Sequence, residues 1–525
     1  MKNRNPFSLF KVGALAALLP LLLLADSQPN IVYILADDMG YGDVQCLNPG
    51  RGKIATPHMD RVAAEGMIFT DAHTTSSVCT PTRYGIITGR YNWRTKLQEG
   101  VLNGYGLPLI PTTRMTVPRF LSDNGYTTAM IGKWHLGLDI ATIDGKQARA
   151  AGGIREKLKM GPFPSGQLSN IDWKGSIQGG PVDLGFDSWF GITASLDFPP
   201  YVWIRDRNWV GEGTHVKAFK RPGPATEDFE AIEVLGKLAA ETVQFISEYQ
   251  SNKPFFIYMP LPSPHTPIVP SQKWQGQSGI GHYGDFMMQT DDIVGQVVQA
   301  LEAQGLSGNT LLIVTSDNGC SKAANFKQLE SHGHFASAQY RGSKADLWEG
   351  GHRVPFLVKW PAVIKAGSRS DVITCQTDLL ATCAELVGKE LPANAGEDSE
   401  SILPIFKGKP VEFSRKGIVN HSVSGHFAYR QGKWKLLLAK GSGGWTLPNE
   451  KEMSKVSDAL KGQLYDLEED PAETTNLYEK NLEVAARLLA QLKDDISRGR
   501  STDGLNAKND VAAIKLWKNE KGRNK

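Results

Sequence analysis

The chain has 525 residues, of which 41% are hydrophobic and 22% are charged, and its formal net charge at pH 7 is +3. These proportions are those of an ordinary globular protein with a large core, and so small a net charge gives no electrostatic case for binding nucleic acid. The length corresponds to about three average domains, although α/β enzymes often place more than the average in one unit.

The first residues are typical of a secretory signal peptide. Lys2, Arg4 and Lys11 precede the apolar run VGALAALLPLLLLA at residues 12–25, after which a polar chain begins. The run is shorter than the roughly 18–20 apolar residues that cross a bilayer, and no later stretch is long and apolar enough to do so. We therefore expect an exported protein, periplasmic or secreted, with no membrane span after signal removal.

Three continuous apolar runs end in polar residues, a pattern typical of strands buried on both faces of a parallel sheet. They are NIVYILADD at 30–38, KPFFIYMPLPSPHTP at 253–267 and NTLLIVTSDNG at 309–319. Segments with apolar residues at helical spacing separate them. This alternation predicts an α/β fold, a mostly parallel sheet covered by helices on both sides. The functional site of such a sheet forms beyond the carboxyl ends of its strands.

The sequence changes character after about residue 400. Residues 416–441 have short strand patterns joined by glycine turns, and an amphipathic helix is predicted from residue 481. The predicted divisions are a signal peptide, a catalytic domain, a smaller α+β domain and a polar, loosely attached tail, at residues 1–25, 26–400, 401–500 and 501–525.

Five cysteines, an odd number in an exported chain, leave at least one that is unpaired, modified or bonded to another molecule. Cys375 and Cys383 lie in apolar sequence that looks helical, where thiols are usually buried. A disulfide between Cys46 and Cys320 stays open. Cys79, in the polar loop that precedes a predicted helix in SSVCTPTRYGIITGR, is the candidate for modification.

Oxygen-bearing side chains follow two of the predicted strands. Asp37 and Asp38 end the first, and Asp317 and Asn318 end the last. These are the hard ligands that Ca²⁺ or Mg²⁺ selects, and the larger, more flexible shell of calcium better tolerates an amide oxygen and a bidentate carboxylate. Either pair alone would equally serve to cap the next helix.

Histidines and lysines supply further candidates. GYTTAMIGKWHLG at 125–137 places Lys133 and His135 two residues apart, so that in an extended segment both side chains point to one face. An ammonium beside an imidazole suits an anion, and His265, in a loop after a strand, can donate a proton. Taken singly, a histidine is more often structural and a lysine such as Lys344 is more often solvated.

Two motifs together resemble the type I sulfatases. C-T-P-T-R, from Cys79 to Arg83, is similar to the C-x-P-x-R modification signature of that family, with Thr82 where serine is commoner. The segment from Gly125 to His135 matches the family's second signature, G-Y-x-x-x-x-x-G-K-x-H. With the acidic residues before and after them, the motifs follow the family's order over most of the chain.

The resemblance implies an alkaline-phosphatase-like fold and an enzyme that hydrolyses sulfate esters. In this family the cysteine is oxidised to formylglycine (3-oxoalanine) by a formylglycine-generating or sulfatase-maturing enzyme. The hydrated aldehyde has two hydroxyls, one to attack the sulfuryl group and one whose loss of a proton expels sulfate from a covalent intermediate. By matched position Cys79 is that residue.

Matched positions also imply roles for the other residues. Arg83 would hold the modified residue in place, and Lys133 and Lys344 would stabilise charge on the sulfuryl group and the departing oxygen. His265 would protonate the leaving alcohol and His135 would take the proton of the second hydroxyl. A charged His265 with a neutral His135 implies a bell-shaped pH profile. The implied Ca²⁺ ligands are Asp37, Asp38, the modified Cys79, Asp317 and Asn318.

Residues 192–206 and 330–355 resemble segments of sulfatases that remove 6-O-sulfate from galactose or N-acetylgalactosamine. The implied substrate is therefore a sulfated oligo- or polysaccharide of galacto configuration, with 2-O- or 4-O-sulfated polysaccharides as an alternative. Each candidate sugar contact is explained equally well by the ordering of a loop. The candidate contacts are Asp197, His332, His334 and Arg341.

Other functions stay open. Phosphatases and phosphonate hydrolases share this architecture but usually need a second metal with more histidine and aspartate ligands, whereas this sequence offers Lys133 and Lys344. A non-catalytic binder of sulfated glycans is opposed by the intact set of catalytic residue types, and cysteine-protease chemistry does not account for the acids. The export signal and the lack of a disulfide framework favour a bacterial exported enzyme.

Overall fold

The computed structural model of the protein describes residues 28–150 and 168–518. At its centre is a mixed, mostly parallel ten-stranded sheet with strand order β15-β2-β14-β13-β1-β12-β4-β7-β8-β9. The five middle strands run parallel to one another, as the sequence predicted. They are β13 (Thr310–Ser316), β1 (Asn30–Asp37), β12 (Phe255–Pro264), β4 (Thr127–Lys133) and β7 (Ser188–Ile192).

Shorter strands extend the sheet on both sides, and antiparallel pairing at β13–β14, β14–β2, β7–β8 and β8–β9 makes it mixed. These outer strands are β14 (Phe356–Lys359), β2 (Met67–Phe69), β15 (Ser368–Ser370), β8 (Trp203–Arg205) and β9 (Asn208–Val210).

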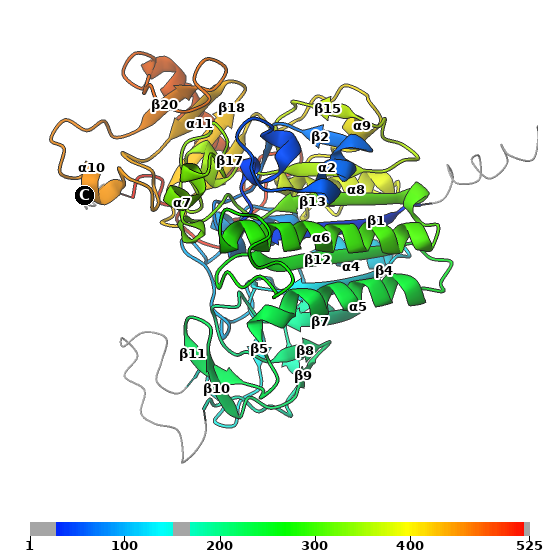
Figure 1. The fold of residues 1–525 in the computed structure, drawn as a ribbon. Coiled ribbons are helices and arrows are strands. Elements are labelled where there is room, and N and C mark those ends of the chain that lie inside the picture. The colour runs from blue at the N-terminus through cyan, green and yellow to red at the C-terminus, as the bar shows by residue number, and fades with distance from the viewer. Residues whose placement is uncertain (1–27, 151–167, 519–525) are drawn as a thin grey trace, which may run out of the picture.

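Helices cover both faces of the sheet, because successive side chains of each middle strand point to opposite faces and both sets are apolar. In β1, Val32 and Ile34 belong to one buried cluster, whereas Ile31 and Tyr33 belong to another. Figure 1 shows α5 and α6 side by side across one face. The first cluster contains α2 (Pro57–Ala64), α5 (Val234–Glu248) and α6 (His282–Ala303), and the second contains α3 (Cys79–Thr88), α4 (Val117–Asp123) and α8 (Leu379–Leu386).

Small two-stranded sheets and short helices lie outside the ten-stranded sheet, and the last of these helices is in the C-terminal part of the chain. The paired strands are β3 (Ala72–His73) with β16 (Thr374–Cys375), β5 (Asp139–Ile140) with β6 (Ile177–Gln178), and β10 (His215–Ala218) with β11 (Pro222–Ala225). The short helices are α7 (Phe326–Ser331), α9 (Leu403–Phe406) and α10 (Glu450–Met453).

The C-terminal part forms its own antiparallel sheet, in the order β17-β18-β19-β20, with α11 (Leu482–Ser497) packed on it. Its strands are β17 (Ile418–His421), β18 (Phe427–Gln431), β19 (Trp434–Leu437) and β20 (Gln463–Asp466). This matches the α+β content expected after residue 400. Figure 1 shows the unit on the side toward which β1 runs, so it lies near the carboxyl ends of the middle strands.

Buried charges join this C-terminal sheet to the main unit. The ammonium of Lys435 lies 2.9 Å from a carboxylate oxygen of Glu349 and 2.8 Å from one of Glu473, and all three side chains are fully buried. Nε2 of His352 accepts from the ammonium of Lys435 at 3.0 Å, and His73 lies 3.0 Å from His352. Because each charge depends on its neighbours for compensation, the loop that carries Glu349 is held against β19.

Residues 501–518 are held against the fold, although the sequence predicted a loosely attached tail. The carboxylate of Asp510 lies 3.1 Å from the guanidinium of Arg90, and its backbone N–H donates to the carbonyl of Arg94 at 2.8 Å. Trp517 packs against the core of the C-terminal unit. The polar composition concealed this attachment because its partner, the buried Arg90, lies some four hundred positions away in sequence.

None of the five cysteines is in a disulfide, so the Cys46–Cys320 bond left open by the sequence is not formed. The thiol of Cys320 instead contacts the hydroxyl of Tyr283 at 3.1 Å. Cys375 and Cys383 are buried as expected, but Cys375 lies in the short strand β16 rather than in a helix.

Within residues 28–150 and 168–518, no helix is both long and apolar enough to cross a membrane. The predicted signal peptide at residues 1–25 falls outside the described residues and stays a prediction.

His421, at the end of β17, gives a pH-dependent contribution to stability. Burial and the charge of Lys518 lower the pKa of His421 to about 3. An unfolded histidine titrates near 6.5, so between these values the unfolded chain binds a proton that the folded chain does not, and stability is lost as the pH falls. Lowering the pH from 7 to 5 should reduce the free energy of unfolding of the wild type by about 2 kcal/mol more than that of His421→Leu.

Urea unfolding at the two pH values measures this difference. The exposed His332→Leu serves as the matched control and should keep the wild-type pH dependence. Equal pH dependence in the wild type and His421→Leu would contradict the assignment of a buried, neutral His421.

Candidate functional site

The predicted catalytic and metal residues meet at the carboxyl ends of the middle strands. The register of β1 aligns Ala36 with Ser316 of β13 and Asp37 with Pro264 of β12, so the residues that follow each pair lie together. The backbone N–H of Asp38 donates to Asp317 at 3.3 Å, which joins two of these strand ends directly. The residues brought together are Asp37, Asp38, Cys79, Arg83, Lys133, His135, His265, Asp317, Asn318 and Lys344.

Cys79 is the first residue of α3, and only 2% of its surface is exposed. Its sulfur lies 3.4 Å from a carboxylate oxygen of Asp37 and 3.4 Å from the ammonium of Lys344. Burial, followed by the charges of Asp317 and Asp37, raises the pKa of the Cys79 thiol well above its usual value. An unmodified Cys79 is therefore a neutral thiol, which argues against cysteine-protease chemistry because that requires a thiolate.

Three cationic side chains face the buried carboxylates. The ammonium of Lys133 contacts Asp37, and the guanidinium of Arg83 approaches Asp317 to 2.8 Å and Asp37 to 3.6 Å. Burial by itself raises the pKa of Asp37, but the cations, Lys133 first, bring it well below its usual value. Burial and the charge of Asp37 raise the pKa of Asp317 to about 6. The third cation, Lys344, contacts Asp38.

The donor atoms fit a divalent metal ion. Asn318 donates its amide N–H to Asp38 at 2.7 Å, which leaves the amide oxygen of Asn318 buried without a hydrogen-bond partner. Ligand atoms of Asp37, Asp38, Cys79 and His265 all lie within 4.8 Å of one another. Carboxylate and amide oxygens are the ligands of hard cations, so the predicted metal residues are present and suitably grouped.

A second cluster with metal-ligand chemistry, which the sequence did not indicate, consists of His73, Glu349 and His352. The ammonium of Lys435 lies within 3.0 Å of both Glu349 and His352. A lysine therefore already supplies the positive charge in this cluster.

His135 is arranged as a base. Its Nε2 lies 2.7 Å from the carbonyl oxygen of Leu102, and because a carbonyl only accepts, Nε2 carries the proton. Nδ1 is then a free acceptor, and it is buried without a hydrogen-bond partner. Burial, followed by the charges of Lys133 and Arg83, lowers the pKa of His135 well below its usual value. This direction favours the neutral ring that the family resemblance implied, and the role of His135 as a base stays a prediction.

His265 reaches the metal ligands from the end of β12, but its surroundings favour the neutral ring. Its Nδ1 donates to the carbonyl of Thr266 at 2.6 Å, and its Nε2 points to Asp38 at 3.8 Å. Burial and the charge of Lys344 lower the pKa of His265, so the free site disfavours the charged ring that the resemblance implied. An approaching anion would act in the opposite direction by offsetting Lys344.

Three of the seven non-glycine residues with positive φ in the described part of the chain belong to the site or adjoin one of its residues. Asp38, His135 and Ala345 are non-glycine residues with positive φ angles of 69°, 61° and 82°. Such conformations cost roughly 1 kcal/mol or more each and persist where the surroundings fix them. We expected Lys133 and His135 to lie in one extended segment with both side chains on the same face. That expectation is wrong for His135, because β4 ends at Lys133 and the chain turns there.

The candidate sugar contacts lie in different settings. Asp197 is buried and pairs with Arg221 at 2.6 Å, and His332 is exposed. His334 is fully buried, with Asp43 at 2.9 Å from one ring nitrogen and the Lys53 N–H at 3.0 Å from the other. Both ring nitrogens of His334 are thus engaged within the protein, and a sugar contact by His334 stays a prediction.

Arg341 is similarly engaged within the protein. Its guanidinium lies 3.6 Å from the ring centroid of Trp348 and donates to the carbonyl of Glu473 at 2.7 Å. Neither of these contacts is with the cluster around Cys79, so a sugar contact by Arg341 stays a prediction.

Several residues near the site carried no signal in the sequence. Thr80 donates to the carbonyl of His135 at 3.0 Å and accepts from the N–H of Leu102 at 3.2 Å, so it ties the helix start to both segments. The ring of Phe198 lies 6.0 Å from that of His135, and Arg221 stacks on Phe198 at 4.1 Å. The one available signal concerned Thr80, which directly follows Cys79 in the C-T-P-T-R motif.

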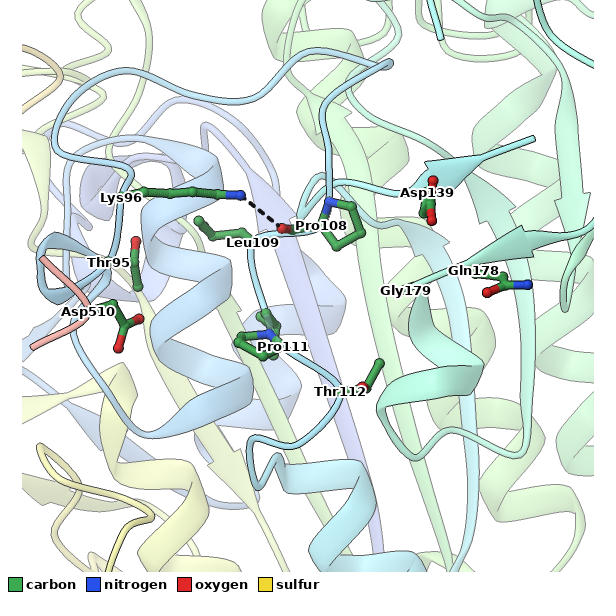
Figure 2. Close-up of a pocket in the computed structure, with 11 residues that line it drawn as sticks. Thr95, Lys96, Pro108, Leu109, Pro111, Thr112, Asp139, Gln178, Gly179 and Asp510 are labelled. Atoms are coloured by element: carbon green, nitrogen blue, oxygen red, sulfur yellow. Dashed lines mark hydrogen bonds between the residues drawn. The ribbon is translucent and has the colours of Figure 1, made fainter. Parts of the chain in front are cut away.

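A separate cavity of about 580 Å³ lies beside the loop that follows η3, the single helical turn at Asn92–Arg94. Figure 2 shows its walls, with Pro108, Leu109 and Pro111 among polar side chains that include Lys96. None of the catalytic or metal residues lines it. A backbone hydrogen bond from the N–H of Leu109 to the carbonyl of Leu136, at 3.0 Å, joins its wall to the segment that follows His135.

Comparison with known proteins gives this geometry its context. The Sulfatase family profile matches residues 29–389, and a profile described as the C-terminal part of N-sulphoglucosamine sulphohydrolase matches residues 343–502. The chain belongs to the sulfatase family. It is a member of the type I sulfatases, which are sulfuric ester hydrolases, in the branch that contains N-acetylgalactosamine-6-sulfatases.

Individual sulfatases are similar over most of their length. An N-acetylgalactosamine-6-O-sulfatase of Bacteroides thetaiotaomicron is 30% identical, over 89% of this chain and 93% of its own. The mouse N-acetylgalactosamine-6-sulfatase is 28% identical, over 84% of this chain and 76% of its own. A solved sulfatase structure from work on glycosaminoglycan metabolism in B. thetaiotaomicron has a TM-score of 0.75 and 30% identity, covering 89% of this chain and 99% of its own.

The oxygen donors predict that a divalent cation stabilises the folded enzyme. After treatment with a chelator, adding the cation at about 100 times its Kd should raise the unfolding free energy by about 2.7 kcal/mol. In Asn318→Ala the same addition should give a smaller increase, because the partnerless amide oxygen is gone. Thermal and urea unfolding with and without cation measure both values.

Asn124→Ala, in α4's C-terminal turn, is the matched control and should respond to the cation as the wild type does. A wild type that is unaffected by Ca²⁺ and by Mg²⁺, or an Asn318→Ala response equal to that of the wild type, would contradict a metal site at these residues.

Proposed function

We propose that this sulfatase removes 6-O-sulfate from galactose or N-acetylgalactosamine units of a sulfated glycan, using a formylglycine at position 79 and Ca²⁺. The observation that carries the proposal is the position of Cys79, at the start of α3 between the acidic metal ligands and the ammonium of Lys344. The named activities of the relatives support the choice of substrate. The amino-terminal 25 residues support export.

The implied groups supply two kinds of chemistry. A hydrated formylglycine would provide an oxygen nucleophile, and Ca²⁺ held by the acids and Asn318 would lower the pKa of that oxygen and attract the sulfate. The protein contributes orientation: Arg83, with its Nε 2.9 Å from Asp317 and another nitrogen 3.1 Å from the carbonyl of Lys133, fixes the helix start relative to two strand ends.

Charge stabilisation falls to Lys133 and Lys344. Both ammonium groups are buried at the carboxylates beside position 79, so they are in place before the reaction. Preorganised charge of this kind is commonly the largest catalytic contribution, with one donor worth roughly 3 kcal/mol.

Proton transfer divides between the two histidines. Nδ1 of His135 is the free acceptor, so it takes a proton from the group at position 79. Nε2 of His265 gives a proton to the leaving alcohol, after the anionic substrate has offset the charge of Lys344 and allowed the ring to be protonated.

A phosphatase or phosphonate hydrolase of the same architecture is the main alternative. Lys133 and Lys344 contact the acids directly, so two ammonium groups stand beside the metal ligands. Two ammonium groups in place of a second metal favour a single metal ion, which supports a sulfatase over a phosphatase that needs two metals.

A panel of esters tests the proposal. We expect sulfate release from 6-O-sulfated N-acetylgalactosamine or galactose to exceed release from 2-O- and 4-O-sulfated sugars, and to exceed phosphate release from matched phosphate esters. Cys79→Ala should abolish it, because it removes the nucleophile. Ion chromatography of released sulfate and phosphate gives both comparisons.

Preference for 2-O- or 4-O-sulfate would remove the assigned position while keeping the reaction. Phosphate release above sulfate release would favour the phosphatase alternative, and full activity in Cys79→Ala would overturn the catalytic role of position 79.

A further inference from the structure

The cluster around Cys79 is most exposed at His265 and Lys344. Its residues are almost completely enclosed, and only His265 and Lys344 keep more than 2% of their surface exposed, at 8% and 5%. When a sulfate group is bound in the cluster, the rest of the glycan must therefore lie on the side of these two residues.

Three chain segments meet around Lys344. The backbone N–H of Lys344 donates to the carbonyl of Cys320 at 2.9 Å, which brings the segment after the metal ligands to it. The carboxylate of Asp346 accepts from the N–H of Ser343 at 2.9 Å and from the N–H of Trp445 at 2.8 Å. The loop that precedes α10 in the C-terminal unit is thereby fixed to the turn that carries Lys344.

Close packing strengthens this attachment. The hydroxyls of Ser343 and Thr446 lie 3.1 Å apart, and Thr446 also donates its N–H to Asp346 at 3.0 Å. At Gly444 an added Cβ would lie 2.2 Å from the carbonyl oxygen of Ala345, so only glycine permits this approach of the two loops. The position of Trp445 relative to Lys344 is consequently well determined.

Trp445 is exposed although it is anchored at its backbone. Of its surface, 40% is accessible, whereas Trp93, Trp134, Trp189 and Trp348 are buried almost completely. The ammonium of Lys322 lies 5.0 Å from the centroid of the Trp445 ring. Among the residues that the structure describes, no carboxylate lies within salt-bridge distance of Lys322.

We infer that Trp445 and Lys322 form a subsite for the sugar next to the sulfated residue, and that this neighbour bears a negative charge. The inference rests on the proposed function, because it adds a neighbouring sugar to the substrate proposed there. An exposed indole offers a large, rigid face whose negative π surface attracts the C–H groups of a sugar ring. The unpaired ammonium of Lys322 suits a carboxylate or a second sulfate on that ring. The enzyme is then built for an oligosaccharide rather than a monosaccharide.

Kinetics on three substrates test the subsite: 4-nitrophenyl sulfate, 6-O-sulfated N-acetylgalactosamine, and an oligosaccharide in which the same sulfated residue is joined to a uronic acid. Trp445→Ala should lower kcat/KM for the oligosaccharide by about tenfold, while the values for the two small esters stay within about twofold. Trp445→Phe should retain most of the oligosaccharide activity, because an aromatic face remains.

Two further variants sharpen the result. Lys322→Gln should lower kcat/KM for the uronic acid oligosaccharide but leave unchanged that for an oligosaccharide with a neutral neighbouring sugar. Leu447→Ala is the matched control, since Leu447 is 65% exposed in the same loop and should have no effect on any substrate. Unfolding curves for each variant confirm that the loop change leaves the fold intact.

Equal effects of Trp445→Ala on all three substrates, or no effect on the oligosaccharide, would overturn the subsite while sulfate release by the wild type upheld the proposed function. A wild type that releases sulfate from none of the three would overturn the proposed function, and the subsite with it.

Discussion

The site depends on the burial of three carboxylates within one enclosed space. Asp37, Asp38 and Asp317 lie at the ends of two adjacent parallel strands, β1 and β13. The register of these strands keeps the three carboxylates close together. Like charges in such surroundings repel strongly, so the arrangement requires cations. Arg83, Lys133 and Lys344 meet this need in part, and the free amide oxygen of Asn318 indicates a place for a metal ion.

The same constraint explains why the C-terminal unit belongs to the active site rather than to the periphery. Lys344 must be held at Asp38, yet it lies on a turn outside the main sheet. Two sets of buried contacts secure that turn, the Lys435 network around Glu349 and the Asp346 carboxylate with the loop of Trp445. A unit that the sequence separates from the predicted catalytic domain at about residue 400 thus positions the lysine for which we propose a catalytic role.

Local sequence patterns were sufficient for the middle of the fold and for the residues at the strand ends. Continuous apolar runs predicted β1, β12 and β13, and the polar residues that follow them identified Asp37 and Asp317, because in parallel sheets those positions converge. The motif around Cys79 predicted a helix start that α3 confirms.

What the sequence could not provide are contacts between distant segments. The pairing of Arg90 with Asp510 attaches the apparent tail to the fold, and the pairing of His334 with Asp43 buries one of the candidate sugar contacts. The extended geometry expected for His135 failed because tertiary contacts, with Leu102 above all, hold that residue at a positive φ. Each of these outcomes is set by a partner that no local pattern identifies.

The central claim is that an oxidised side chain at position 79 carries out the hydrolysis. Its most direct test is peptide mass spectrometry across Cys79, paired with sulfate-release rates, on enzyme produced with and without a sulfatase-maturing enzyme. The account predicts that the rate rises in proportion to the fraction of position 79 found as the aldehyde. Full turnover by a preparation in which Cys79 is entirely an unmodified thiol would contradict it.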